Sequence, residues 1–250
     1  MIETLPDLET AAAERVLAWG LETFGDRLAV CTSFQAEGIV ILDMAARLER
    51  HVRVFTIDTG RLPQETYDLM EEVRRRYGIQ VEVLLPKSRE VESMVTRHGP
   101  NLFYDAVAKR MLCCEVRKVR PLERKLATLD AWVTGLRRGQ SETRAGVQKV
   151  QTDQAHGGIV QLNPLADWTD EQVEDYLSAN DLPRHALYAQ GYTSIGCAPC
   201  TRPPAPGEGA RSGRWWWESD ARKECGIHFS ADGKVNREAD ILLEEILRVR

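Results

Sequence analysis

Two cysteine pairs and one single cysteine are the residues whose types and spacing point to chemistry. Cys197 and Cys200 form a Cys-x-x-Cys pair, Cys113 and Cys114 are adjacent, and Cys225 follows a segment rich in Pro, Gly and Arg. Four cysteines in two groups match the ligands of a tetrahedral zinc ion or of an iron–sulfur cluster. Structural zinc prefers a gap of about two to four residues between paired cysteines, so the adjacent pair favours the cluster.

The adjacent pair also constrains the helix that carries it. On a regular helix, the side chains of Cys113 and Cys114 point about 100° apart. Their joint use as ligands therefore requires a distorted helix, or a cluster that lies against the helix.

The single cysteine, Cys225, is the candidate nucleophile. Lys223 and His228 lie close to it in the sequence. A cationic neighbour lowers the pKa of a thiol and so raises the fraction present as thiolate. Cys31, in contrast, lies in an apolar stretch and is interpreted as a small buried side chain.

The elements that must position these cysteines alternate between strand and helix. Strands are predicted at 27–33, 52–57, 79–85, 131–135 and 159–162, and helices at 8–24, 38–48, 63–77, most of 89–127, 169–183 and the last fifteen residues. This order predicts an α/β fold, with a mostly parallel sheet covered by helices on both faces.

Three strand ends carry polar or basic residues that are candidates for ligand binding. These are Ser33, Phe34 and Gln35, then Asp58, Thr59 and Gly60, and then Gly135, Arg137 and Arg138. Ligands of open α/β sheets bind at such ends, where helix N-termini favour anions. An arginine fork suits phosphate or sulfate oxygens. The three ends predict a nucleotide-like ligand, although ordinary connections and solvated turns have similar sequences.

Composition excludes several classes of protein. The formal charge of −5 gives no reason to expect nucleic acid as a partner. No apolar run reaches the roughly 20 residues that cross a bilayer, and the N-terminus lacks the order of a signal peptide. A cytoplasmic location is therefore expected, where cysteines are metal ligands or reactive thiols more often than disulfides.

Seven segments taken together resemble the assimilatory sulfonucleotide reductases, in particular the cluster-containing adenylyl-sulfate (APS) reductases. They are residues 32–35, 58–62, 113–118, 135–141, 191–202, 213–218 and 223–228, so the resemblance covers nearly the whole chain. It implies an adenine nucleotide α-hydrolase-like fold, related to the PP-loop enzymes. It also implies one 4Fe-4S cluster per subunit, bound by Cys113, Cys114, Cys197 and Cys200.

The resemblance further implies a domain organisation and a mechanism. A nucleotide- and cluster-binding domain, 1–205, would precede a mobile segment, 206–250, that carries the catalytic Cys225. The Cys225 thiolate would attack the sulfur of APS, AMP would leave, and thioredoxin or glutaredoxin would release sulfite from the S-sulfocysteine. The cations placed around the phosphosulfate by matched position are Lys118, Arg211, Arg214 and His228.

Other functions stay open at this point. The close alternative is a reductase of 3′-phosphoadenylyl sulfate (PAPS), or one that accepts both nucleotides. More distant alternatives are a PP-loop enzyme that modifies tRNA and a non-catalytic iron–sulfur sensor. The loop at 33–38 reads Ser-Phe-Gln-Ala-Glu-Gly and lacks the Ser-Gly-Gly-x-Asp-Ser of ATP pyrophosphatases, which argues against ATP activation. The sequence is compatible with a homo-oligomer and does not fix the oligomeric state.

Overall fold

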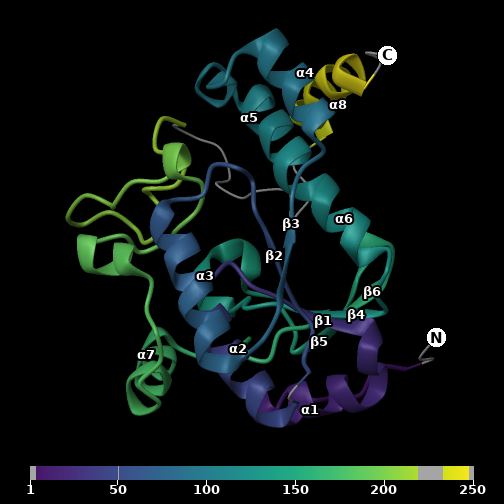
Figure 1. The fold of residues 1–250 in the computed structure, drawn as a ribbon, viewed down its shortest axis with the longest axis vertical. Coiled ribbons are helices and arrows are strands. Elements are labelled where there is room, and N and C mark those ends of the chain that lie inside the picture. Colours follow the sequence, from purple (N-terminus) through teal and green to yellow (C-terminus); the bar gives the residue numbers. More distant parts are fainter. Residues whose placement is uncertain (1–3, 50, 219–232, 248–250) are drawn as a thin grey trace. The chain divides into compact units, whose positions relative to one another are not determined.

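The computed structural model describes residues 4–49, 51–218 and 233–247, and the side chains of 233–237 are outside that description. Figure 1 shows the helices and strands along the chain. The helices are α1 (Ala13–Phe24), α2 (Ala36–Leu48), α3 (Gln64–Tyr77), α4 (Ser88–His98), α5 (Val107–Cys114), α6 (Arg120–Leu126), α7 (Asp170–Ala179) and α8 (Gly233–Leu247). The strands are β1 (Leu28–Cys31), β2 (Val54–Ile57), β3 (Val81–Leu84), β4 (Ala131–Val133), β5 (Val150–Asp153) and β6 (Ile159–Leu162).

The strands form a six-stranded sheet in the order β3-β2-β1-β4-β6-β5. Strand β1 runs parallel to β2 and to β4, and β4 runs parallel to β6. Strand β5 pairs with β6 in the antiparallel direction at the edge of the sheet. The predicted mostly parallel α/β sheet is confirmed, and β5 is an edge strand that the sequence analysis did not identify.

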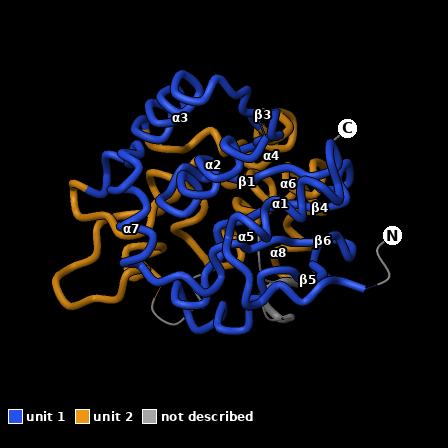
Figure 2. The backbone as a smooth tube through the Cα atoms, turned by 90° about the horizontal axis from the view of Figure 1, so that it is seen from below, with its two compact units in different colours: residues 1–56, 64–83, 126–188 blue, residues 57–63, 84–125, 189–250 orange. Residues whose placement is uncertain are grey.

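The chain divides into two compact units, which Figure 2 distinguishes by colour. Unit 1 comprises residues 1–56, 64–83 and 126–188, and unit 2 comprises residues 57–63, 84–125 and 189–250. Each unit is made of several separate stretches of the chain. The division therefore differs from the predicted one, which has a single boundary at residue 205. The boundary predicted at residue 205 separates the segment that carries Cys225. Because Cys225 lies outside the described residues, this boundary stays a prediction.

Unit 1 contains most of the sheet and has its own hydrophobic core. Val30, Val54 and Val133 of neighbouring strands are buried there, together with Ile39 and Leu42 of α2. The predicted capping box begins α7: the Thr169 hydroxyl accepts from the Gln172 N–H, and the Gln172 side chain accepts from the Thr169 N–H. Such a box satisfies backbone donors that would otherwise lack partners at the helix start.

Unit 2 is mainly helical and has a second core. Met94 of α4, Leu112 of α5 and Ile246 of α8 are buried in it, beside Cys113, Cys114, Cys197 and Cys200. Helix α8 packs against α5 and α4. The helical prediction for 89–127 holds, with the interruptions between α4, α5 and α6.

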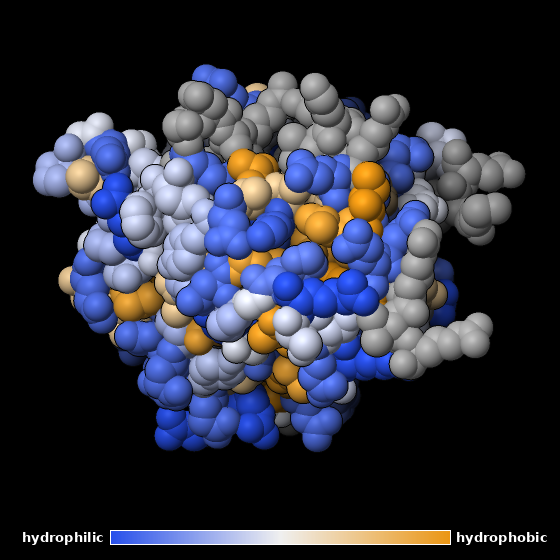
Figure 3. Space-filling model, turned by 90° about the horizontal axis from the view of Figure 1, so that it is seen from above, coloured by the Kyte–Doolittle hydropathy of each residue, from blue (hydrophilic) through white to orange (hydrophobic). Residues whose placement is uncertain are grey.

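On the face that Figure 3 shows, hydrophilic residues predominate and hydrophobic residues form small groups among them. Within the described ranges, none of the helices combines the length and the apolar character needed to cross a bilayer.

Candidate functional site

The four paired cysteines line one cavity of unit 2, which we call the thiol cavity. Cys113 and Cys114 come from the end of α5. Cys197 precedes a short helical turn, Ala198–Cys200, which ends at Cys200. All four are buried. The other lining residues are Arg61, Phe103, Arg110, Arg117, Lys118, Pro199 and Trp215. The sequence prediction that the two pairs meet is therefore supported by the geometry.

A helix distortion, one of the two arrangements predicted for the adjacent cysteines, lies directly after them, whereas the cysteines themselves belong to the regular helix α5. Residues Glu115–Val119 form a π-helical stretch between α5 and α6. A π turn inserts an extra residue and rotates the side chains on one side of it relative to those on the other. Cys113 and Cys114, the last two residues of α5, both line the thiol cavity.

Positive charge surrounds the thiol cavity. Arg61, Arg110, Arg117 and Lys118 all contribute to its lining. Arg117 is 9% exposed, and its Nη1 donates to the Thr59 carbonyl over 2.6 Å. The Arg117 Nε has no hydrogen-bond partner in the described structure, and the same holds for the Trp215 Nε1. Two buried N–H donors thus lie among the thiols without an oxygen acceptor.

The predicted substrate-binding loop Asp58-Thr59-Gly60 lies beside the thiols. The Thr59 hydroxyl is 3.2 Å from Cys197 Sγ and accepts from the Arg61 backbone N–H, so its own proton is available to the sulfur. Asp58 accepts from the Gly60 N–H over 2.7 Å and so forms the turn itself. Gly60 has φ of +69°, a conformation that favours glycine.

The thiols differ in acidity because their neighbours differ. Burial raises the pKa of Cys200 to about 12. Burial also raises the pKa of Cys113, with Arg117 opposing it. For Cys197 burial acts in the same direction, but the Lys118 charge and the Thr59 hydrogen bond outweigh it, and the net pKa is lowered.

The segment that follows Cys200 returns to the same cavity. Thr201 and Arg214 pair as an antiparallel bridge, and the Trp215 N–H donates to the Cys200 carbonyl over 3.1 Å. The loop between them therefore starts and ends beside the thiols. Arg211, a predicted substrate ligand, is half-buried at the end of this loop.

Arg214, another predicted substrate ligand, is 6% exposed. Its Nη1 donates to the Ser194 hydroxyl and the Ile195 carbonyl, and its guanidinium lies 4.8 Å from the centroid of the Trp215 ring. A Cβ on Gly196 would meet the Arg214 guanidinium, which would have to move from this position. Cys225 and His228 lie outside the described residues.

In unit 1, the first strand end has the turn that the sequence predicted. Phe34 is buried with φ of 57°, and its N–H donates to the Thr32 hydroxyl. Gln35 Nε2 donates to the Ser33 hydroxyl over 3.0 Å. Helix α2 begins at Ala36, whose N–H donates to the Tyr188 hydroxyl over 3.1 Å. One of the first N–H groups of α2 is therefore already engaged.

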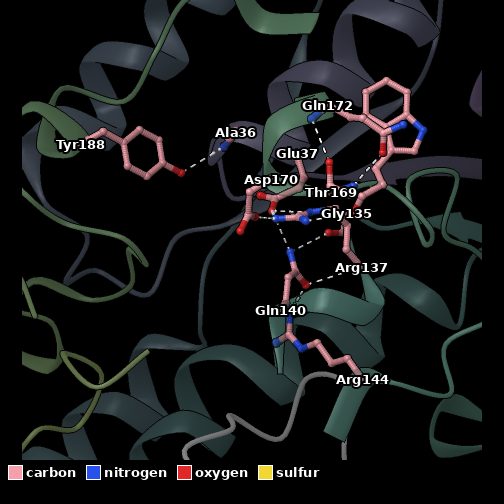
Figure 4. A network of polar contacts seen from close by, with 11 residues as sticks. Ala36, Glu37, Gly135, Arg137, Gln140, Arg144, Thr169, Asp170, Gln172 and Tyr188 are labelled. Carbon is pink, nitrogen blue, oxygen red and sulfur yellow. Dashed lines mark hydrogen bonds and ion pairs between the residues drawn. The ribbon is translucent and has the colours of Figure 1, made fainter. Parts of the chain in front are cut away.

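The strand end at Gly135 is held by a partly buried polar network, shown in Figure 4. Arg137 donates from Nε and Nη2 to Glu37 Oε1, at 3.0 and 2.8 Å, and also pairs with Asp170. Gln140 Nε2 donates to Glu37 Oε1 and to the Gly135 carbonyl. Gly135 packs so closely that a Cβ there would lie 2.9 Å from the Glu37 Cβ.

Both predicted oxyanion-binding arginines of this loop have partners within unit 1. Arg138 pairs with Glu9, and its Nε donates to the Val147 carbonyl over 2.8 Å. Arg137 is 5% exposed. The sequence analysis did not select Arg144, whose Nη1 donates to Gln140 in the same network. Extending the predicted basic loop beyond Ser141 would have included Arg144.

The fold and the thiol cavity define an α/β protein suited to thiol or metal chemistry, and comparison with known proteins specifies the family. The family model "Phosphoadenosine phosphosulfate reductase domain" matches residues 27–203. The chain therefore belongs to the phosphoadenosine phosphosulfate reductase family, as the sequence resemblance predicted.

Three relatives illustrate the match. An adenosine 5'-phosphosulfate reductase of Allochromatium vinosum is 45% identical over 226 residues, which cover 90% of this chain and 87% of that protein. One of Burkholderia cepacia is 46% identical over 205 residues, covering 82% of each. The solved phosphoadenylyl-sulfate reductase of Candida auris has a TM-score of 0.66 at 30% identity, covering 76% of this chain and 92% of that one.

The acidity difference within the thiol cavity gives a direct test. In protein without bound metal, Cys197 is expected to be alkylated by iodoacetamide at lower pH than Cys200, because the thiolate is the reactive form and burial is similar for both. Peptide mass spectrometry after labelling pulses across a pH series measures this.

The cause of the difference is tested by a charge removal. Lys118→Met should move the Cys197 profile to higher pH. Lys109→Met, which removes a lysine of α5 that pairs with Asp105, should leave it in place. Identical profiles for Cys197 and Cys200 in the wild-type protein would contradict the assignment.

Proposed function

We propose that the chain catalyses the reduction of APS to sulfite and AMP, in the assimilation of sulfate for cysteine biosynthesis. The observation that carries this function is the meeting of four buried thiols in a cation-lined cavity, in a chain of this family. The two bacterial relatives, both named adenosine 5'-phosphosulfate reductase, support APS as the substrate.

A 4Fe-4S cluster fits the thiol cavity. Its ligands would be Cys113, Cys114, Cys197 and Cys200, whose sulfurs line a common space. Within the described ranges, no three His, Cys, Asp or Glu side chains form a group suited to a single metal ion. The buried N–H donors without partners, at Arg117 Nε and Trp215 Nε1, suit sulfur atoms as acceptors. Four cysteine donors beside these N–H groups support the proposed iron–sulfur centre.

When bound, the cluster would supply a fixed charge distribution beside Lys118 and the substrate, because the thiol route already supplies both electrons. The protein's own residues carry out the bond changes. Cys225 is the nucleophile: its thiolate attacks the sulfonyl sulfur, the bond from that sulfur to the AMP phosphate oxygen breaks, and AMP leaves. Lys118, Arg211, Arg214 and His228 lower the repulsion between the thiolate and the anionic substrate.

Turnover requires a dithiol reductant, for which we propose thioredoxin or glutaredoxin. One thiolate of the reductant attacks Cys225 Sγ and releases sulfite, which leaves a mixed disulfide. The second thiol of the reductant then resolves this disulfide, so that Cys225 returns to its thiol form and the reductant is oxidised. The cytoplasm, where such reductants are kept reduced, remains the expected location.

Roles in nucleotide binding stay predictions from the sequence for Ser33, Phe34, Gln35, Asp58, Thr59, Gly60, Gly135, Arg137 and Arg138. The contacts of Arg137 and Arg138 support a specific version of this role. Since both guanidinium groups have carboxylate partners, we propose that they act on the nucleotide through the loop they hold. Thr59 contacts Cys197, one of the proposed cluster ligands, and would therefore act beside the cluster.

The cluster assignment predicts that protein purified without oxygen is brown and contains about four iron atoms per chain. Replacing Cys113, Cys114, Cys197 or Cys200 singly by Ser should remove most of the iron and the visible absorption. Cys31→Ser is the matched control, because Cys31 lies on β1 in unit 1, and it should retain both. A colourless zinc protein would contradict the assignment.

The substrate assignment predicts sulfite release from APS with thioredoxin as reductant, with kcat/KM at least about tenfold higher than for PAPS. The PAPS arm addresses the alternative raised by the fungal reductase of this fold. Cys225→Ser, the control, should release no sulfite from either nucleotide. Preference for PAPS would overturn the proposed substrate.

A further inference from the structure

A buried ion pair connects the helix of the adjacent cysteines to the chain that leads toward Cys225. Arg110, on α5, donates from Nε to Glu218 Oε1 over 2.9 Å and from Nη2 to Glu218 Oε2 over 3.1 Å. Both side chains are 4% exposed. Glu218 is the last described residue before 219–232, the range that includes Cys225.

Stability alone does not explain this pair. Removing two charges from water costs several kcal/mol per ion, and a well-packed apolar pair in the same place is often as stable or more so. A bidentate arginine–carboxylate pair adds a fixed direction, which apolar contacts do not. The pair therefore contributes orientation.

Arg110 also contacts the other parts of the site. It lines the thiol cavity together with the four cysteines. Its guanidinium lies 4.8 Å from the centroid of the Trp215 ring, a distance at which a cation and an aromatic face attract. One side chain thus touches the cavity, the Trp215 ring and the Glu218 carboxylate.

The short segment between Trp215 and Glu218 is fixed at both ends. At its start, the Trp215 N–H donates to the Cys200 carbonyl, and within it the Glu218 N–H donates to the Trp215 carbonyl over 2.9 Å. At its end, the Glu218 side chain is held by Arg110. The position and direction of the chain at residue 218 are therefore set relative to both cysteine pairs.

We propose that Arg110 and Glu218 are a positioning pair for the nucleophile, fixing the point from which the chain continues to Cys225. This inference rests on the proposed function, because it assigns to the pair the task of placing the thiol that attacks APS. Misplacement of a reacting group by about 1 Å costs roughly a hundredfold in rate. Loss of the pair should therefore lower the rate of attack more than substrate affinity.

The test compares Glu218→Gln and Arg110→Lys with Glu90→Gln. Glu90 accepts two hydrogen bonds from Arg120 in the same unit, at 2.9 and 3.0 Å, so that control breaks an equally bidentate pair that is not in the thiol cavity. The measurements are iron per chain, kcat and KM for sulfite release from APS, and the single-turnover rate of the S-sulfo adduct without reductant.

We expect Glu218→Gln and Arg110→Lys to lower kcat and the adduct rate by about tenfold or more, with iron content and KM near wild-type values. Glu90→Gln should leave kcat within about twofold of wild type. An unchanged kcat in Glu218→Gln, or a kcat that falls only in proportion to iron, would overturn the inference. A wild-type protein that forms no adduct and no sulfite would instead contradict the proposed function.

A double variant keeps the proposal testable if the single substitutions prevent folding. The double variant Arg110→Met with Glu218→Leu replaces the ion pair by an apolar pair, which is expected to restore packing and iron content. Its kcat should stay about tenfold or more below wild type, because the fixed direction is missing. Recovery of the wild-type kcat in this variant would show that packing alone is needed, and would overturn the inference.

Discussion

Four thiol groups and several positively charged side chains share one buried space in unit 2, and this burial of charge is the constraint on which the site depends. A buried cation is costly unless an anion or an acceptor lies close to it. Arg110 has the Glu218 carboxylate and Arg117 has the Thr59 carbonyl. Lys118 lowers the pKa of Cys197 against the effect of burial, so the ammonium group stabilises the thiolate form of this cysteine. Cationic neighbours therefore favour the thiolate form of Cys197, whereas burial raises the pKa values of Cys113 and Cys200.

Unit 1 contains a similar pairing of arginine with carboxylate groups, at the end of strand β4. Glu37 stands in the first turn of α2 and accepts from both Arg137 and Gln140. The pair joins the loop after β4 to the start of α2, and Asp170 adds the start of α7. Arg137, which the sequence analysis predicted to bind an oxyanion, thus also holds the loop after β4 in place. Ligands of open α/β sheets bind at such loops.

Much of the fold followed from local patterns. The apolar runs before Ser33 and Gly135 are strands, and the Thr169 capping box begins a helix, because hydrophobic burial and helix capping act over a few residues. Strand β5 was missed because its residues, Val-Gln-Thr-Asp, are mostly polar, as an edge position allows. The adjacent cysteines predicted either a distorted helix or a cluster that lies against the helix. They end the regular helix α5, and a π-helical stretch follows at 115–119.

The long-range pairs were beyond sequence reasoning. Arg110 and Glu218 are 108 residues apart and Arg137 and Glu37 are 100 apart, and single charges at such separations form no recognisable pattern. The predicted role of Cys225 came from its cationic sequence neighbours and from the family resemblance. The family model matches residues 27–203, so this role stays a prediction.

The most direct test of the division between ligand and nucleophile is peptide mapping after a single turnover. Protein holding its cluster is mixed with APS without reductant, the remaining thiols are alkylated, and the sulfonate is located by mass spectrometry. The peptide with Cys225 should carry the sulfonate, and those with Cys113, Cys114, Cys197 and Cys200 should carry none. A sulfonate on one of these four cysteines, with Cys225 unmodified, would contradict the proposed mechanism.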